Sequence, residues 1–78
     1  MKTIDQDVDL SNLYLEVLPD FLSDVWVKGD FNCFRNQLTS LEGAPKEVGG
    51  DFHCYNNKVK FTEEQVRAVC KVKGRVYC

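Results

Sequence analysis

An internal repeat constrains this chain more than any other feature of its sequence. Residues 29–38 (GDFNCFRNQL) and residues 50–59 (GDFHCYNNKV) share the pattern G-D-F-x-C-aromatic-x-N-x-aliphatic at an offset of 21 residues. A degenerate copy precedes them at an offset of 23, in which Val8, Leu10, Leu13, Leu15 and Leu18 correspond to Phe31, Cys33, Asn36, Leu38 and Leu41. Terminal units of stacked arrays are commonly atypical. A repeat of this length predicts similar units stacked side by side.

Each unit carries one predicted strand with an apolar side. Because side chains alternate along a strand, Phe31 and Cys33 point to one side, and Phe52 and Cys54 do the same in the next unit. A single unit cannot bury this side alone, so we expect the strands to stack into a short parallel sheet. The asparagine that follows each strand, such as Asn36, stands where the chain must turn and can hydrogen-bond the backbone of a neighbouring unit.

The periodicity changes after residue 60. Thr62 can cap a helix, and Gln65, three positions later, completes a capping box. The apolar stripe at i, i+3, i+4 spacing consists of Val66, Val69 and Cys70. We therefore predict a capping helix over about 62–71, followed by a final strand over 75–78 with Val76 and Cys78 facing inward. This helix and strand are expected to cover the open end of the stack.

These elements define one α/β repeat domain over residues 1–78. Ala44-Pro45 and Gly49-Gly50 favour irregular return segments between the strands. The spacing x-L-x-L-x-x-N-x-L with a period of about 20–29 residues is typical of leucine-rich repeats, and here Phe and Cys replace the strand leucines. We predict a small leucine-rich-repeat-like solenoid with an N-terminal degenerate repeat or cap (1–28), consensus repeats (29–60) and a C-terminal helix–strand cap (61–78).

The middle of the chain resembles a known viral family. Residues 36–57 (NQLTSLEGAPKEVGGDFHCYNN) are similar to leucine-rich-repeat-like proteins of large tailed bacteriophages, whose units look like N-x-L-T-S-L-E-G-A-P-x-x-V-G-G-x-F-x-C. Residues 8–11 and 59–70 resemble the caps of that family, so the resemblance covers roughly residues 8–77. The chain departs from the family in repeat number, because it has one full consensus linker, residues 38–50. The resemblance implies a viral protein in an infected bacterium, and no catalytic residues belong to the family's motif.

The sequence predicts a cytoplasmic protein without a membrane partner. No stretch approaches the roughly 18 consecutive apolar residues of a membrane-spanning helix. Residues 1–7 (MKTIDQD) lack the apolar core of a signal peptide. With the viral resemblance, the expected location is the cytoplasm of an infected bacterial host, where disulfides are rare.

The four cysteines form no C-x-x-C pair, so a zinc-ribbon pattern is absent. Cys33, Cys54 and Cys78 fall at inward strand positions and Cys70 on the helix stripe, and we interpret them as small core hydrophobes. A metal cluster with His53 and a disulfide at Cys78 formed in air are the alternatives. Because adjacent strand residues point apart, His53 and Cys54 do not predict a thiol enzyme. We expect no catalytic residue, cofactor, metal or small-molecule substrate.

The outward strand positions carry the functional prediction. The stacked columns are Asp7, Asp30, Asp51 and Arg75, then Asp9, Asn32, His53 and Tyr77, then Ser11, Phe34 and Tyr55. Phe34 and Tyr55 have no evident structural role on a solvent side, and exposed aromatic side chains among polar groups are typical of protein interfaces. Aromatic pairing that only stabilises the sheet is the alternative. The predicted partner-binding residues are Asn32, Phe34, Asp51, His53, Tyr55, Arg75 and Tyr77.

Trp26 alternates with Val25 and Val27 ahead of the second repeat unit. We interpret Trp26, together with Leu22, as part of an apolar plug at the N-terminal end of the stack. A binding role at the rim of the molecule is the alternative for this side chain.

Charge is distributed unevenly along the chain. Residues 1–30 carry seven acidic and two basic side chains, a net of −5, and residues 58–78 carry six basic and two acidic ones, a net of +4. In a stack of units, sequence order becomes spatial order, so the two ends are predicted to differ in charge and to steer a partner. A solvated surface with a chance imbalance is the alternative.

These observations predict a non-catalytic protein-binding module. With the viral resemblance, the expected partner is a bacterial host protein or defence system. The chain is expected to bind this partner through its exposed strand face and to modulate it, with inhibition as the expected effect. Two alternatives stay open. One is a nucleic-acid-binding accessory protein, whose basic residues would be Lys58, Lys60, Lys71, Lys73 and Arg75. The other is a structural protein that self-associates end to end.

Overall fold

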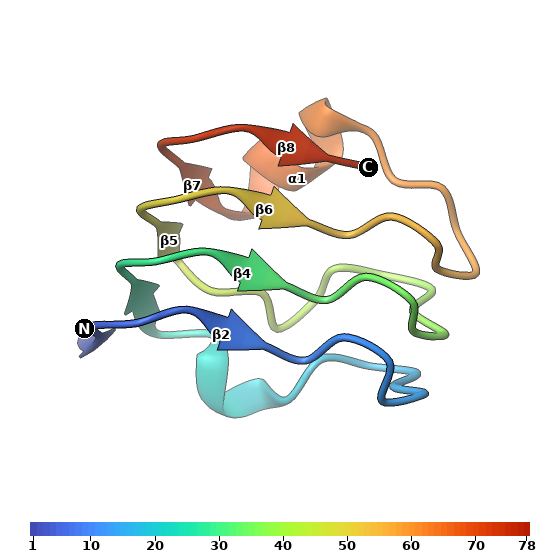
Figure 1. Ribbon diagram of the computed structural model, residues 1–78, viewed down its shortest axis with the longest axis horizontal. Helices are drawn as coiled ribbons and strands as arrows, with labels where there is room; N and C mark the ends of the chain where they lie inside the picture. Colours follow the sequence, from blue (N-terminus) through green and yellow to red (C-terminus); the bar gives the residue numbers. More distant parts are fainter.

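The computed structural model describes residues 1–78, whose strands form two parallel four-stranded sheets (Figure 1). The first sheet has the order β1-β3-β5-β7 and contains Lys2–Ile4, Val25–Val27, Glu47–Val48 and Lys71–Val72. The second has the order β2-β4-β6-β8 and contains Val8–Asp9, Phe31–Asn32, Phe52–His53 and Val76–Tyr77. Because strands of the two sheets alternate along the chain, each circuit adds one strand to each sheet.

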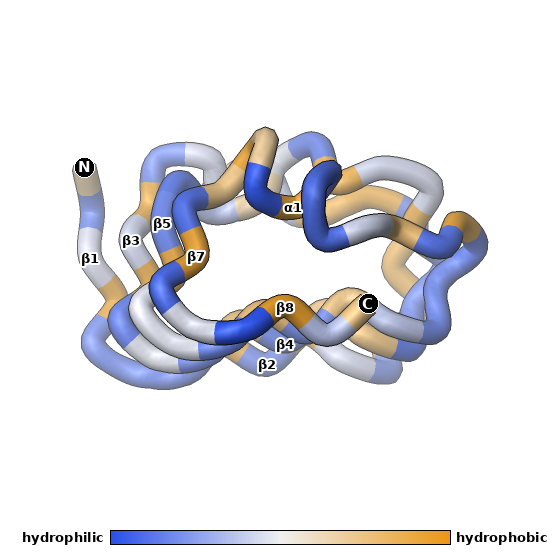
Figure 2. The backbone as a smooth tube through the Cα atoms, turned by 90° about the horizontal axis from the view of Figure 1, so that it is seen from above, coloured by the Kyte–Doolittle hydropathy of each residue, from blue (hydrophilic) through white to orange (hydrophobic).

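Seen from the C-terminal end, the chain follows a flattened ring (Figure 2). The sheet β2-β4-β6-β8 forms one long side, and the sheet β1-β3-β5-β7 lies at one end of the ring. The short 3-10 helix η1 (Asp20–Leu22) and the helix α1 (Glu63–Val69) lie in return segments, and α1 packs against both β7 and β8. A core of 16 buried apolar residues fills the inside of the ring. None of the helices has the length and apolar character needed to cross a membrane.

The register of the second sheet confirms the sequence alignment. Val8 pairs with Phe31, Phe31 with Phe52, and Phe52 with Val76, so these apolar residues form one inward column. The rings of Phe31 and Phe52 are fully buried, with their centroids 5.1 Å apart. The offset of 21 residues seen in the sequence is therefore the strand-to-strand register between β4 and β6.

The first sheet corrects the prediction of irregular return segments. Backbone bonds from Gly49 N to the Val27 carbonyl (2.7 Å) and from Lys71 N to the Lys46 carbonyl (3.0 Å) flank the pairing of β5 with β3 and β7. The two residues of β5 stand between Pro45 and Gly49, and so short a strand gives no alternation pattern. Only the neighbouring strands make this segment regular.

The C-terminal helix is confirmed but is shorter than predicted. Thr62 Oγ1 accepts a bond from Gln65 N (3.1 Å), and Gln65 Oε1 accepts one from Thr62 N (2.9 Å), which completes the capping box. Helix α1 ends at Val69 because Cys70 is extended and the chain continues directly into β7. Val66 is fully buried, whereas Val69 is 50% exposed, so the predicted stripe was wrong for Val69.

Two asparagines connect successive circuits of the chain. Asn36 is 3% exposed; its Oδ1 accepts from Leu13 N and Leu15 N (3.0 Å each), and its Nδ2 donates to the Leu10 and Cys33 carbonyls. Asn57 repeats the arrangement one circuit later, accepting from Leu38 N and donating to the Cys33 and Cys54 carbonyls. The predicted role of the repeat asparagines is thereby confirmed.

Candidate functional site

The outward side of the sheet β2-β4-β6-β8 presents the predicted polar and aromatic column. Asp9 pairs with Asn32, Asn32 with His53, and His53 with Tyr77, so the four side chains follow one line across the sheet. Phe34 and Tyr55 lie just beyond the ends of β4 and β6 and stack on each other. We refer to Phe34, His53, Tyr55 and Tyr77 as the aromatic face.

The aromatic face consists of two parallel stacks. The rings of Phe34 and Tyr55 have centroids 4.7 Å apart and an interplanar angle of 9°, and those of His53 and Tyr77 are 4.7 Å apart at 6°. His53 also meets Phe34 and Tyr55 edge-on, at 6.2 and 6.3 Å. The stacking distance matches the spacing of about 4.8 Å between neighbouring strands. Strand register therefore places these rings at stacking distance from each other.

The aromatic face remains accessible to a partner. Phe34, His53 and Tyr55 are half-buried, and Tyr77 is 40% exposed. The Nδ1 atom of His53 is buried without a hydrogen-bond partner, so the ring is held by stacking rather than by a polar bond at that atom. Asn32, also half-buried, lies beside His53 and adds a polar amide to the same surface.

The aspartate column beside the aromatic face has a structural role that the sequence analysis missed. Asp7 Oδ1 accepts a bond from Asp30 N, Asp30 Oδ1 from Asp51 N, and Asp51 Oδ1 from Arg75 N, each at 2.8 Å. A glycine precedes each donor residue, because a Cβ on Gly29, Gly50 or Gly74 would collide with these carboxylate oxygens and with the backbone of the preceding circuit. This contact explains why the repeat contains the pair Gly-Asp.

Two predicted site residues at the edge of the aromatic face differ in what they offer a partner. The Asp51 carboxylate is half-buried and occupied by Arg75 N, so a partner reaches only its remaining oxygen. The Arg75 side chain is exposed and takes part in none of the three salt bridges of the protein. The face therefore has a free cation on the β8 side.

Asp9 gives the β2 end of the column Asp9, Asn32, His53 and Tyr77 a negative charge. The Ser11 hydroxyl and then the Ser11 backbone N–H donate to Asp9 Oδ1, and these bonds lower the pKa of Asp9 below its ordinary value. Asp9 is exposed and precedes Asn32 in the register, so it belongs to the surface although it was left out of the predicted set. This side of the sheet therefore has an anion at β2, and Arg75, which belongs to the neighbouring aspartate column, adds a cation beside β8.

Trp26 does not belong to an N-terminal plug, and this prediction was wrong. In this segment, Leu22, Val25 and Val27 point into the core. Trp26 lies half-buried on the outward side of β3. The ammonium groups of Lys28 and Lys73 lie 5.1 and 5.6 Å from the centroid of its ring. Strand alternation between two buried valines explains this orientation.

The first circuit of the chain exposes four apolar side chains that the sequence analysis did not identify. They are Leu13 (52% exposed), Tyr14 (82%), Val17 (68%) and Phe21 (66%). Leu13 was predicted to occupy a repeat position, but the equivalent Asn36 faces inward to bond the backbone, a contact that a leucine cannot make. Val59, at the other end of the repeats, is likewise 38% exposed.

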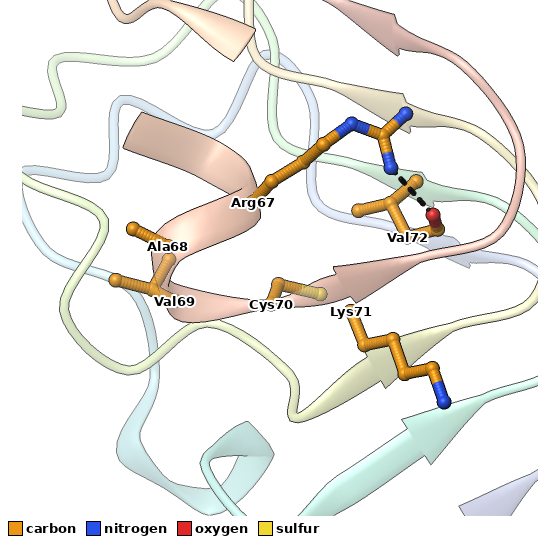
Figure 3. Close-up of a pocket in the computed structure, with 6 residues that line it drawn as sticks. All are labelled: Arg67, Ala68, Val69, Cys70, Lys71 and Val72. Carbon is orange, nitrogen blue, oxygen red and sulfur yellow. Dashed lines mark hydrogen bonds between the residues drawn. The ribbon is translucent and has the colours of Figure 1, made fainter. Parts of the chain in front are cut away.

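A shallow hollow of about 370 Å³ lies beside the C-terminal end of α1 (Figure 3). It is lined by residues 67–72, a single continuous segment. The Arg67 guanidinium donates to the Val72 carbonyl (2.6 Å) and the Gly74 carbonyl (3.0 Å) and pairs with Glu63 (2.9 Å). Arg67 therefore fastens α1 to β7 and to the connection between β7 and β8.

The cysteines occupy two different environments. Cys33, Cys54 and Cys70 are buried, as predicted, but Cys78 is exposed, because β8 ends at Tyr77 and no strand covers it. Burial, followed by the proximity of Cys78, raises the pKa of Cys54 to about 12, and burial, followed by Glu47, raises that of Cys70 to about 12. Burial also raises the pKa of Cys33. No three His, Cys, Asp or Glu side chains come together in a way that could hold a metal ion.

We expect one thiol of the native protein to react with Ellman's reagent at pH 8. The thiolate is the reactive form, so buried thiols with raised pKa values stay protonated and shielded at this pH. Cys78→Ser should reduce the native titration from one thiol to none. In guanidinium chloride, where all thiols are accessible, four thiols of the wild type and three of the variant should react. Rapid native reaction of a second thiol would contradict the burial of Cys33, Cys54 and Cys70.

Comparison of the chain with models of known protein families, with curated proteins and with solved structures finds no match. The resemblance to bacteriophage leucine-rich-repeat-like proteins therefore stays a prediction.

Proposed function

We propose that this chain is a small leucine-rich-repeat-like solenoid that works as a non-catalytic protein-binding module. The aromatic face is the observation that carries this proposal. Its two stacked aromatic pairs lie beside an exposed arginine and a polar column on one accessible side of a sheet. Aromatic and arginine side chains are enriched among the residues that dominate the free energy of protein–protein binding.

The packing of the rings on each other within the aromatic face favours binding. A side chain that is already held by its neighbours loses little conformational entropy when a partner covers it. Phe34 is held by Tyr55, and His53 by Tyr77, at stacking distances set by the backbone. A row of side chains along a sheet suits a complementary protein surface better than a small molecule, which needs a concave pocket.

The expected partner follows from the sequence resemblance. Residues 36–57 resemble units of bacteriophage proteins, so we propose that the chain is phage-encoded and engages a bacterial host protein or defence system in the host cytoplasm. Inhibition is the proposed consequence of binding, because covering a surface of the host protein blocks access to it.

A capture experiment with paired variants tests the proposed surface. The wild type and the variant F34A/Y55A are immobilised and exposed to the same bacterial lysate, and retained proteins are quantified by mass spectrometry. We expect the variant to retain about tenfold less of the specific partner, or less still. Truncation of two interface aromatics commonly costs about 2 kcal/mol or more of binding free energy. The matched control Y14A/F21A removes the same two residue types from exposed positions outside the aromatic face and should retain the partner.

A second variant separates binding from sheet stability. Asn32→Arg places a long cation on the aromatic face while both aromatic pairs remain. If the rings only stabilise the sheet, F34A/Y55A should lower the melting temperature, and Asn32→Arg should leave partner capture unchanged. Equal capture by the wild type, F34A/Y55A and Asn32→Arg would show that the aromatic face is not the binding surface.

A further inference from the structure

Both sheets end in unpaired strands at both ends of the molecule. Strands β1 and β2 each have one strand neighbour at the N-terminal end, and so do β7 and β8 at the C-terminal end. Edge strands present unpaired backbone N–H and C=O groups that can pair with another chain. All pairings within the sheets are parallel, so a second copy placed end to end would meet each edge with strands running in the same direction.

A column of residues in the first sheet has an acidic side chain at one end and a basic side chain at the other. Ile4 pairs with Val27, Val27 with Val48, and Val48 with Val72. The residues that follow them, Asp5, Lys28, Gly49 and Lys73, therefore form one column with an anion at the first end and a cation at the last. Within the chain, Lys28 Nζ already lies 3.4 Å from Asp5 Oδ1. The ion pair between Asp5 and Lys28 thus shows that a lysine on the neighbouring strand can reach Asp5.

The aspartate column repeats this pattern on the second sheet. It begins with Asp7 beside β2 and ends with Arg75 beside β8, where the carboxylates of the earlier circuits are replaced by a cation. Arg75 is exposed, and Asp7 is exposed as well. Asp5 and Asp7, between β1 and β2, are therefore matched at the other end by Lys73 and Arg75, between β7 and β8, while Lys2 is the one basic side chain within β1.

We propose that the protein associates head to tail with a second copy, the acidic β1–β2 end of one molecule docking on the basic β7–β8 end of the next. Lys73 then faces Asp5 of the next copy, and Arg75 faces its Asp7. Half-buried Val76 meets half-buried Val8, which continues the inward apolar column. Like charges oppose the two-fold arrangements that would join two identical ends, so the contact is heterologous and leaves one free end of each kind.

The proposed contact depends on ionic strength and concentration. Its charges are exposed, and the screening length shortens from about 30 Å at 0.01 M salt to about 8 Å at 0.15 M. An open head-to-tail contact does not close on itself, so the mean mass should rise with protein concentration. Asp5 and Lys73 lie outside the aromatic face, so this association and the proposed partner binding can fail independently.

Sedimentation velocity at low salt, over a range of protein concentrations, tests the proposal. The weight-average mass of the wild type should rise above the monomer mass of 9.0 kDa with concentration and return toward it in about 0.5 M salt. Asp5→Lys and Lys73→Glu should each stay near the monomer mass because one end now repels the other. The double variant D5K/K73E restores opposite charges and should associate again.

Two controls change the net charge by the same amount away from the ends. Glu42→Lys and Lys46→Glu alter exposed side chains in the middle of the chain and should associate like the wild type. Circular dichroism checks that each variant is folded. A wild type that remains at the monomer mass at every concentration would overturn the proposal. In that case η1 and α1 would act as caps that keep a second copy from docking at either end. A plateau at twice the monomer mass would overturn it in favour of a closed dimer.

Discussion

Phe52→Ala is expected to lower the free energy of unfolding by about 3–5 kcal/mol, the range found when a buried phenylalanine is truncated. Phe52 is fully buried on the inward side of β6, between the neighbouring strands β4 and β8, and its ring packs on that of Phe31. A chain of 78 residues has a total stability of roughly 4–12 kcal/mol. This single substitution therefore removes a large fraction of the stability. Urea denaturation followed by the fluorescence of Trp26 and by circular dichroism measures the loss.

Phe21→Ala is the matched control for Phe52→Ala. Phe21 is 66% exposed, so its removal should change the free energy of unfolding by no more than about 0.5 kcal/mol. If Phe52→Ala does not fold, Phe52→Leu keeps most of the side-chain volume and should cost about 1–2 kcal/mol. A loss below about 1 kcal/mol for Phe52→Ala would mean that the inward column is not closely packed.

Asn36→Ala is expected to destabilise the protein by about 2–4 kcal/mol. Its side chain is buried and joins the backbone of two circuits, and the substitution leaves Leu13 N and Leu15 N without acceptors. A buried polar group that loses its partner costs about 1–3 kcal/mol. Asn36→Leu should be as unstable as Asn36→Ala, because the apolar side chain supplies no hydrogen bond. Denaturant titration of both variants measures the effect.

The alternative explanation for the importance of Asn36 is packing volume. In that case Asn36→Leu, which fills the space, would recover most of the stability that Asn36→Ala loses. Asn56→Gly serves as the control, because Asn56 is exposed and has a positive φ of 56°, which glycine adopts easily. It should change the free energy of unfolding by about 0.5 kcal/mol or less.

The repeat predicted much of the second sheet and of the candidate site. Two segments with the same residue pattern must place equivalent residues side by side when they stack, so the pairing of Asn32 with His53 follows from their positions in the pattern. Alternation then assigns Phe34 and Tyr55 to the opposite side from Cys33 and Cys54. The chain adopts this register because any shift by one residue would turn the buried phenylalanines outward.

The first sheet could not be predicted in the same way. Strands of two residues, such as β5, carry no periodicity, and their regularity comes from hydrogen bonds to segments more than 20 residues away. The position of Trp26 depended on this sheet, because a tryptophan between two valines faces solvent only if both valines face a core. The exposure of Cys78 likewise depended on where β8 ends.

The sequence by itself determined which side chains share a column, the helix cap at Thr62, and the opposite charges of the two ends. These properties follow from local spacing and from the order of residues along the chain, which a stack of circuits converts into positions in space. Only the tertiary structure decided that the return segments form a second sheet, that the repeat aspartates accept backbone hydrogen bonds, and that the strand edges at both ends stay unpaired. Each of these depends on contacts between circuits that are distant in sequence, where local propensity carries no information.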